Sequence, residues 1–509
     1  MNKRFDVGPS LLLLPRIFHS IFEDLGTSLQ AEGVKLLQCY PNYEIWFDDG
    51  QKFRVSTDTA QMKSEIEKFE GNDGFHRYLD FLREAHQHYE LSVTHVLRKN
   101  FTSLFSMLRP SFVKHLVTLH PFESIWSRAS KYFWTERLRR VFTFASMYMG
   151  MSPFDAPGTY SLLQYTELAQ GIWYPEGGFY RVIDALVEIG KRLGVKYHLD
   201  QPVSSVQLDD AGRKATGIQL RSGKVVTADV VIINADLVYA YNNLLPKNSK
   251  SQALQSRKAS CSSISFYWAM DRRISALATH NIFLASKYRE SFDDIFKKQQ
   301  LPEEPSFYVN VPSRVDSTAA PAGKDSIVVL LPVGHLLDEL EGRGIQTENK
   351  QDWKAIVEKA RSTVFDIVAK RTGADLQSAL IHESVHTPVS WKETFNLDRG
   401  AILGLSHDFF NVLSFRPKTK HASIDALYFT GASTHPGTGV PICIAGGRLV
   451  ADQVLNEFSM AKPWTTRPQQ SKTSRIDEVQ RPYMLSNIHF ALVAMIPILL
   501  GLLFVFLQG

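Results

Sequence analysis

The sequence of 509 residues predicts an α/β fold with a second unit interleaved into it. Near residue 176 a glycine pair opens an amphipathic helix that leads into short strands, and near residue 421 a buried strand runs through a glycine-rich loop into another helix. Such alternation is typical of an α/β nucleotide-binding layer. A helical stretch before residue 176 and a strand-rich stretch after residue 246 do not fit that layer, so they predict a separate unit.

Composition excludes several classes of protein. Hydrophobic residues make up 44% of the chain and charged residues 21%, as in globular proteins. The net charge of +5 is distributed over 57 basic and 52 acidic side chains without a basic block, so we expect no nucleic-acid partner. Cys39, Cys261 and Cys443 are too few and too far apart for a disulfide framework or a zinc cluster, which favours a reducing compartment.

The first extended element that we expect is helical, from Asp73 to about Gly150. The segment "FHRYLDFLREAHQHYELSVTHVL" repeats apolar residues at steps of three and four. The following "FTSLFSMLRPSFVKHLVTLHPFESIW" mixes Phe and Trp with Arg and Lys. This composition is typical of an interfacial surface or a tunnel mouth, and equally of the core of a helical cap, so both interpretations stay open.

The helix-to-sheet unit follows. In "GGFYRVIDALVEIGKRLGV" a helix is expected between Gly178 and Gly194, with its apolar residues on one face. We expect strands at 197–199 and 203–208, then a hairpin across Ser222 and Gly223 that leads into the apolar run 230–233.

Beyond residue 246, "ISFYWAM" and "DSIVVLLPV" predict strands, and "DWKAIVEKARSTVFDIVAKR" predicts a helix. Then "ALYFTGASTHPGTGVPICIAGGRLVADQVL" predicts a strand at 427–430 and a helix from about Ile442. The glycines between them would let a ligand approach the backbone, and the helix N-terminus would stabilise an anionic group such as a pyrophosphate. A tight turn without a ligand fits the same spacing.

These residues carry a resemblance to a known family. The segment "FTGASTHPGTGVPICIAGGRLVADQVL" resembles the C-terminal signature of carotenoid (phytoene) desaturases of the bacterial and fungal type, which belong to the FAD-dependent amine-oxidase-like superfamily. "RFDVGPSLLLLP" is similar to the segment after the family's first flavin-binding unit, and "GIWYPEGGFYRVIDALVEIGKRLGV" to its mid-chain motif. The family's "VVINAD" is matched at 231–236 with one extra isoleucine, and the resemblance covers Arg4 to about Leu455.

The resemblance implies an FAD-dependent enzyme that dehydrogenates phytoene towards lycopene or a more desaturated product. Its substrate is a lipophilic C40 polyene dissolved in a membrane, so the membrane is an implied partner and oligomerisation is compatible with the sequence. The implied fold is a glutathione-reductase-like, Rossmann-type FAD domain with an interleaved α+β substrate domain and a C-terminal transmembrane helix.

The family's flavin contacts can be carried over to this sequence. The resemblance implies that residues of the glycine-rich loop line the ribityl chain and the ring: Gly431, Ala432, Gly437, Gly439 and Val440. It implies that Val203 meets the adenine through its backbone, and that Gly8 and Pro9 approach the isoalloxazine. The side chain that takes the substrate proton stays unknown; His435 is adjacent by motif, but a histidine in such a loop is more often structural.

The start of the chain raises a further expectation. Family members begin with a βαβ unit that carries a G-x-G-x-x-G fingerprint, which does not occur in this sequence. We therefore expect the FAD domain to be N-terminally truncated, through a missing first exon in the gene model, a shorter isoform or a degenerate paralogue. A non-catalytic, membrane-tethered remnant that cannot bind FAD is the alternative function.

Together these patterns predict seven segments along the chain. They are 1–70, a remnant of the FAD domain and the start of the substrate domain; 71–175, a helical substrate- or membrane-facing region; 176–245, the second FAD-domain segment; 246–420, the substrate-domain sheet; 421–458, the third FAD-domain segment; 459–487, a linker; and 488–509, a transmembrane anchor.

The anchor is expected from "FALVAMIPILLGLLFVFL" at 490–507. These 18 residues carry no charge and would span about 27 Å as a helix, against a hydrocarbon core of about 30 Å. Arg475 and Arg481 precede the span, so the positive-inside rule predicts a single-pass membrane protein with its globular part in the cytosol.

A second motif belongs to another class of protein. "HESVH" at 382–386 matches H-E-x-x-H, which binds zinc in metalloproteases when it lies on a helix. The surrounding "IHESVHTPVSW" alternates and reaches Pro388, so we expect a strand, in which residues four apart lie roughly 13 Å from each other. Two such histidines cannot share one zinc ion, so a zinc protease is a remote alternative and we expect no metal site.

Overall fold

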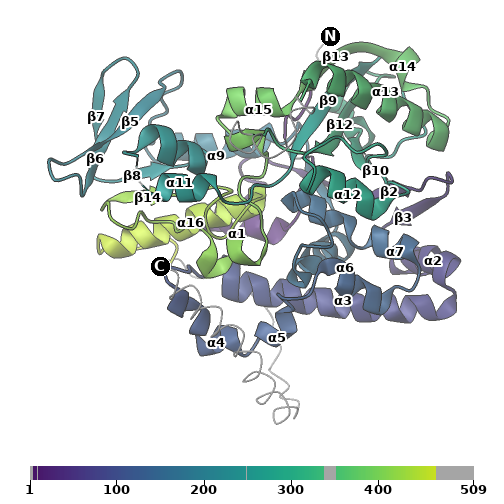
Figure 1. The fold of residues 1–509 in the computed structure, drawn as a ribbon, viewed down its shortest axis with the longest axis horizontal. Helices are drawn as coiled ribbons and strands as arrows, with labels where there is room; N and C mark the ends of the chain where they lie inside the picture. Colours follow the sequence, from purple (N-terminus) through teal and green to yellow (C-terminus); the bar gives the residue numbers. More distant parts are fainter. Residues whose placement is uncertain (1–3, 9, 248, 338–350, 466–509) are drawn as a thin grey trace.

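The computed structural model describes residues 4–8, 10–247, 249–337 and 351–465. A seven-stranded sheet and a pair of small sheets lie at opposite ends of the molecule, and a layer of helices runs along one side (Figure 1).

The large sheet has the strand order β13-β9-β12-β11-β10-β2-β3. Its strands are β2 (Tyr43–Trp46), β3 (Lys52–Val55), β9 (Ser262–Met270), β10 (His280–Phe283), β11 (Phe307–Asn310), β12 (Ser326–Val333) and β13 (Leu380–His386). The strands expected in "ISFYWAM" and "DSIVVLLPV" are β9 and β12, which pair antiparallel over eight residues. Helix α13 (Trp353–Thr372) covers this sheet and buries Val364 and Val368 against Trp268.

The N-terminal part of the chain completes this sheet. Strand β2 pairs parallel with β10, so residues about 240 positions apart in sequence are neighbours, and β3 forms the edge. Every residue of β2 is buried, because the strand lies between two others and under helices.

The nucleotide-binding-type half contains two small sheets with helices packed beside them. Strands β8 (Val231–Ile233) and β14 (Leu427–Phe429) pair in parallel. Strands β5 (Val203–Leu208), β6 (Ala215–Leu220) and β7 (Val225–Thr227) form an antiparallel sheet, which confirms the predicted hairpin. Helices α9 (Tyr180–Arg192) and α16 (Val440–Glu457) lie beside them (Figure 1).

One predicted strand is wrong. Residues 197–199 are not a strand but an exposed connection between α9 and β5, and Leu199 is 82% exposed. Alternating apolar residues there are not paired with a neighbouring strand in the part of the chain that the structure describes, so the local pattern alone does not produce a ladder.

The stretch predicted to be helical is helical. Between Asp73 and Gly150 it contains α3 (Asn72–Ser92), α4 (Pro110–Val113), α5 (Leu116–Leu119), α6 (Ile125–Tyr132) and α7 (Glu136–Val141), with the single-turn segments η1 (Val93–Leu97), η2 (Leu104–Leu108) and η3 (Phe144–Met149). Outside the predicted stretch, α2 (Thr59–Glu70) precedes it, and η4 (Gly158–Ser161), α8 (Leu162–Tyr165) and η5 (Thr166–Gln170) follow it. The shorter helices elsewhere are α10 (Leu237–Tyr239), α11 (Ser249–Gln255), α12 (Tyr288–Phe296), α14 (Leu376–Ala379) and α15 (Pro388–Phe395).

The segment before residue 25 connects these parts. Asp6 accepts a hydrogen bond from the backbone N–H of Phe179 at 3.0 Å, and Arg4 forms an ion pair with Asp316 at 2.6 Å. Helix α1 (Pro15–Asp24) then packs beside α16. A short pair of strands, β1 (Leu36–Gln38) and β4 (Trp173–Pro175), continues the connection. Residues 7–8 and 10–14 are thereby held between the two halves of the molecule.

Within the described ranges, no helix combines the length and the apolar character needed to cross a membrane. The predicted anchor at 490–507 and its flanking Arg475 and Arg481 lie outside those ranges.

Candidate functional site

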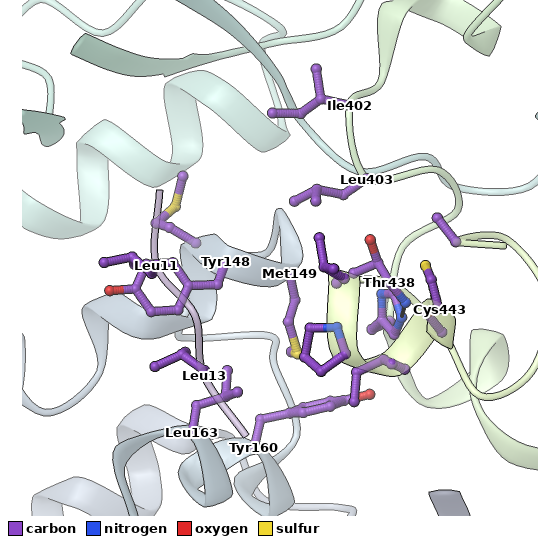
Figure 2. Close-up of a pocket in the computed structure, with 18 of the residues that line it drawn as sticks. Leu11, Leu13, Tyr148, Met149, Tyr160, Leu163, Ile402, Leu403, Thr438 and Cys443 are labelled. Atoms are coloured by element: carbon purple, nitrogen blue, oxygen red, sulfur yellow. Dashed lines mark hydrogen bonds between the residues drawn. The ribbon is translucent and has the colours of Figure 1, made fainter. Parts of the chain in front are cut away.

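A cavity of about 1000 Å³ lies where the two halves and the helical layer meet. Its wall is predominantly apolar, with Leu11 and Leu13 on one side and Ile402 and Leu403 on another (Figure 2). A cavity of this size and character accommodates a large apolar ligand, and the few polar groups on its wall determine where a reacting atom would lie.

The glycine-rich loop forms one wall of this cavity. Gly431, Gly437 and Gly439 have φ of 119°, 138° and 101°, a region that side-chain-bearing residues rarely adopt. At Gly437 an added Cβ would lie 2.4 Å from Nε2 of His407, whereas at Gly439 its nearest neighbour would be 3.8 Å away. The space beside Gly439 is therefore open, and it adjoins the cavity.

Helix α16 begins at this open space. Its N-cap is Gly439, which has no side chain to bond the free N–H groups of the first turn. The first residues of the helix line the cavity, so these N–H groups and the positive end of the helix dipole are available to an anionic or electron-rich ligand. The open cradle and the uncapped helix fit the ribityl and phosphate side of a flavin cofactor.

Arg416 holds this loop in place. It is 1% exposed, and its guanidinium donates to the carbonyl oxygens of Thr434 at 3.0 Å, Ser406 at 3.0 Å and Asn411 at 2.7 Å, and also to those of Leu405 and Ala432. Burial lowers the pKa of Arg416 to about 10, so the side chain is still charged at neutral pH. One side chain therefore fixes segments 405–411 and 432–434 against each other.

His407 lies on the segment that Arg416 fixes. Its Nε2 accepts a hydrogen bond from the backbone N–H of Thr438 at 3.1 Å, beside Gly437. Burial, and then the charge of Arg416, lower the pKa of His407 well below its ordinary value, so the ring is neutral and can accept this bond.

Most of the predicted flavin contacts lie at the cavity. Gly8, Ala432, Gly437, Gly439 and Val440 line it. Gly431 lies between two lining residues, with the Asn234 amide 2.8 Å from where its Cβ would be. Val203, by contrast, is the first residue of β5 and does not line the cavity, and Pro9 lies outside the described residues.

His435 lies behind the loop and does not line the cavity. Its Nε2 bonds the carbonyl oxygen of Lys99 at 2.8 Å, its ring packs on Phe101, and burial lowers its pKa to about 4. These contacts are those of a structural histidine.

The H-E-x-x-H motif lies on strand β13, as predicted. Glu383 accepts from the indole of Trp268 at 2.7 Å and pairs with Arg361 at 2.8 Å, so its carboxylate is not available as a base. Among the described residues, a different set brings three ligand-type atoms close together, and in that set the glutamate is paired with Arg128: Glu84, His88 and His120.

The structure also reveals a polar cluster that the sequence analysis missed. Tyr148 lines the cavity, and its hydroxyl bonds that of Tyr43, which in turn donates to Oε1 of Glu167 at 2.8 Å. Glu167 is 3% exposed, and burial raises its pKa to about 8. Its sequence context, "YTELAQG", looks like an ordinary helix end, and no spacing links it to residues 43 and 148.

A profile of the family described as flavin containing amine oxidoreductase matches residues 3–455. The chain is 53% identical to a phytoene desaturase of Cercospora nicotianae, covering 98% of this chain and 90% of the relative. It is 58% identical to a phytoene desaturase of Fusarium fujikuroi, covering 94% and 86%. A zeta-carotene-forming phytoene desaturase of Myxococcus xanthus is 37% identical, covering 89% and 84%. The expectation of a missing N-terminal unit finds no support in these comparisons.

Solved structures show the same fold at low identity. An oxidoreductase from Methanosarcina mazei has a TM-score of 0.52 and 14% identity, covering 82% of both chains. A putrescine oxidase redesigned in its cofactor binding has a TM-score of 0.54 and 13% identity, covering 89% of this chain and 88% of that one.

Proposed function

This chain belongs to the flavin-containing amine oxidoreductase family, and from that premise we propose that it is an FAD-dependent desaturase that converts phytoene towards lycopene or a more desaturated product. The observation that carries the proposal is the apolar cavity of about 1000 Å³, which runs from the surface of the helical layer to the glycine-rich loop. Burial of an apolar polyene against such a wall is favourable, because it keeps apolar surface away from water. No observation on the described residues favours the zinc protease or the non-catalytic remnant.

The residues present fit FAD at one end of this cavity. The first turn of α16 and the loop at Gly437 and Gly439 would hold its ribityl side, and Gly8 also lines the cavity. When bound, FAD supplies the two-electron acceptor that removal of hydrogen from an unactivated carbon chain requires. The protein itself holds the polyene, excludes water and provides a group that accepts the proton removed from the substrate.

The test is to purify the full chain, record its flavin absorbance and supply phytoene in liposomes together with a quinone as final acceptor. We expect bound FAD and products with more conjugated double bonds, separated by chromatography. A protein that carries FAD but leaves phytoene unchanged would contradict the proposed substrate, and a flavin-free protein would contradict the proposed cofactor.

We also propose that the cavity opens onto a membrane. Phe122 lines the cavity and is 58% exposed, so the cavity reaches the surface there. Around it lie other exposed apolar side chains, and we call this set the mouth patch: Leu104, Phe105, Leu108, Phe122 and Phe410. Phe122 packs on Phe409, which packs on Phe410. The hydroxyl of Ser414 donates to the carbonyl oxygen of Ser103, directly before η2, at 2.8 Å. The segment η2, the loop before α6 and segment 409–415 therefore share this surface.

Positive charges lie close to the mouth patch. Burial, and then the charges of Lys114, Lys99 and Arg109, lower the pKa of His95, so these three cations gather near one imidazole. Aromatic side chains with cations beside them favour the interface of a membrane that contains anionic lipids. A substrate dissolved in the bilayer could then enter without crossing water.

The predicted span at 490–507 is the second part of this proposal. We propose that it anchors the protein as a single-pass segment with the globular part on the cytosolic side, in agreement with its length, its lack of charge and its flanking arginines. The mouth patch would then be held at the membrane by the anchor.

The two contributions can be separated by flotation with liposomes. We expect deletion of residues 486–509 to release part of the protein from the liposomes. Phe105→Ser with Phe410→Ser, introduced into this truncated protein, should release most of the rest, because both rings are largely exposed. The matched control is Tyr180→Ser with Leu199→Ser, which removes equally exposed side chains from the other half of the molecule. If the control releases as much protein as the mouth variants, the mouth patch is not the docking surface.

A further inference from the structure

Three side chains from distant parts of the sequence form a hydrogen-bonded chain that begins at the cavity wall. Tyr148 is in η3, Tyr43 in β2 and Glu167 in η5. Tyr43 is fully buried and donates its single hydroxyl proton to Oε1 of Glu167 at 2.8 Å. A tyrosine hydroxyl has one proton to donate, so when Glu167 is ionised and accepts from Tyr43, Tyr43 accepts from Tyr148. The chain is therefore oriented from the cavity towards the carboxylate.

The cavity end of this chain has unused acceptor capacity. Tyr148 is only partly buried because it faces the cavity, where it lies near Leu11 in Figure 2. Once Tyr148 donates to Tyr43, the lone pairs of its oxygen are free to accept a proton from a group in the cavity. Ser10, two residues after Gly8, also lines this part of the wall and bonds Tyr308 at 2.8 Å.

The inner end of the chain is a carboxyl group without a cationic partner. Among the described residues, the groups that interact with Glu167 are the hydroxyls of Tyr43 and Tyr148, and burial outweighs them in raising its pKa to about 8. Its backbone is fixed, because Asn42 donates to the Glu167 carbonyl oxygen at 2.6 Å. It lies in a single-turn π-helix, an irregular helix form that is frequent at functional sites. A carboxylate buried without a cation is costly for stability, so a functional reason is expected.

The other titratable groups around this chain are neutral. Tyr43 packs on the ring of His280, 6.0 Å between centroids, and burial lowers the pKa of His280 to about 3. Burial raises the pKa of Cys39, which bonds His280, to about 12, and raises that of Tyr308 well above its ordinary value. The titration of Glu167 is therefore not masked by a neighbour that changes charge near neutral pH.

We propose that Tyr148 takes the proton of the desaturation reaction and passes it through Tyr43 to Glu167. This inference rests on the proposed function and assigns its missing proton acceptor. Tyr148 is the group that touches the substrate, whereas Tyr43 and Glu167 act through it.

The step balances as follows. With FAD bound as the two-electron acceptor, one carbon of the substrate would lose a hydride, and the adjacent carbon would lose a proton to the oxygen of Tyr148. As that O–H bond forms, the original proton of Tyr148 moves to Tyr43, and the proton of Tyr43 moves to the carboxylate of Glu167. The electron pair of the C–H bond that loses its proton becomes the π bond of the new C=C bond, whereas the pair of the other C–H bond leaves with the hydride. Glu167 ends as a neutral carboxylic acid, so the buried pocket gains no charge.

This arrangement predicts a specific dependence on pH. Only the ionised form of Glu167 can accept a proton, and its pKa of about 8 means that this form is the minority at pH 7. We expect kcat/KM of the FAD-loaded protein in phytoene liposomes to rise about tenfold per pH unit below a midpoint near 8, then to level off. Glu167→Gln keeps an acceptor for Tyr43, and should lower the rate by about 10² to 10⁴-fold and abolish this midpoint.

A matched control distinguishes loss of the hydrogen-bonded relay to Glu167 from loss of any hydroxyl group in the cavity wall. Tyr160 also lines the cavity (Figure 2) but is not bonded to Glu167, so Tyr160→Phe should leave the midpoint near 8. Tyr148→Phe should behave like Glu167→Gln. A Glu167→Gln protein that keeps both the rate and the midpoint would overturn the inference and leave the proposed function intact. A wild-type protein without product would overturn the proposed function, and this inference with it.

A second measurement does not depend on activity. The folded protein binds the Glu167 proton up to about pH 8, whereas the unfolded chain releases it near pH 4.5. The contribution of Glu167 to the free energy of unfolding should therefore be largest below pH 4.5 and should fall as the pH rises towards 8. Glu167→Gln cannot titrate, so its Tm should rise relative to wild type between pH 5.5 and pH 8.5. An unchanged difference in Tm would show that Glu167 is not the group with the raised pKa and would overturn the inference.

Discussion

Gly439→Leu is expected to yield a folded protein without flavin. Gly439 has a φ of 101° and precedes the first turn of α16, and its side-chain direction is open towards the cavity. A leucine there would fill the space through which the ribityl chain is expected to pass. Overpacking of this kind costs up to about 3 kcal/mol, so we expect FAD to bind about 100-fold more weakly. The flavin absorbance of the purified protein and a titration with FAD measure this.

The matched control is Gly223→Leu. Gly223 has a φ of 86° in the hairpin between β6 and β7, and an added Cβ there would meet nothing within 4 Å. It therefore bears a similar backbone strain without blocking the cavity, and should keep its flavin. If both variants retain FAD equally, the cofactor does not pass beside Gly439.

Arg416→Met is expected to be the most destabilising single change at the site. The variant keeps much of the side-chain volume but leaves the buried carbonyl oxygens of Leu405, Ser406 and Asn411 without a donor, together with those in the glycine-rich loop. Each unsatisfied buried acceptor costs about 1 to 3 kcal/mol, so we expect a loss of at least about 3 kcal/mol in the free energy of unfolding. Thermal unfolding followed by circular dichroism measures it.

Flavin content should fall in the same variant, because the segment that carries His407 is no longer held against Thr438. Arg16→Met is the control, since Arg16 is exposed and its ion pair with Glu90 is long, at 3.9 Å. An exposed pair of this kind contributes less than about 1 kcal/mol. A Tm loss in Arg416→Met no larger than in Arg16→Met would show that the guanidinium does not hold the loop.

The local elements of the fold could be predicted because their signals are local. The hairpin at Ser222 and Gly223, the strand at β9 and the helix α13 each depend on periodicity and turn residues within about 20 positions. The membership of β2 in the large sheet could not be predicted, because its parallel partner β10 lies about 240 residues away and nothing in either segment specifies the other. The error at 197–199 has the same origin: a strand needs a neighbour that sequence alone does not reveal.

The candidate site likewise has one part that the sequence predicts and one part that it does not. The glycine-rich loop could be predicted because a strand, glycines and a helix follow one another within one segment, and four of its five predicted residues line the cavity. The chain from Tyr148 to Glu167 could not, because three elements contribute one residue each. In sequence Glu167 looks like a solvated carboxylate at a helix end, and only the packing around it buries it with tyrosine hydroxyls and no cation among the described residues.

The central claim is that the flavin and the polyene react in one cavity of this protein. The most direct test is to mix the FAD-loaded protein with phytoene liposomes in the absence of oxygen and of any other acceptor. We expect the flavin absorbance to bleach while the absorbance of a longer conjugated polyene rises, with no more than one new double bond per flavin. A flavin that stays oxidised while product forms, or that bleaches without any product, would contradict the account.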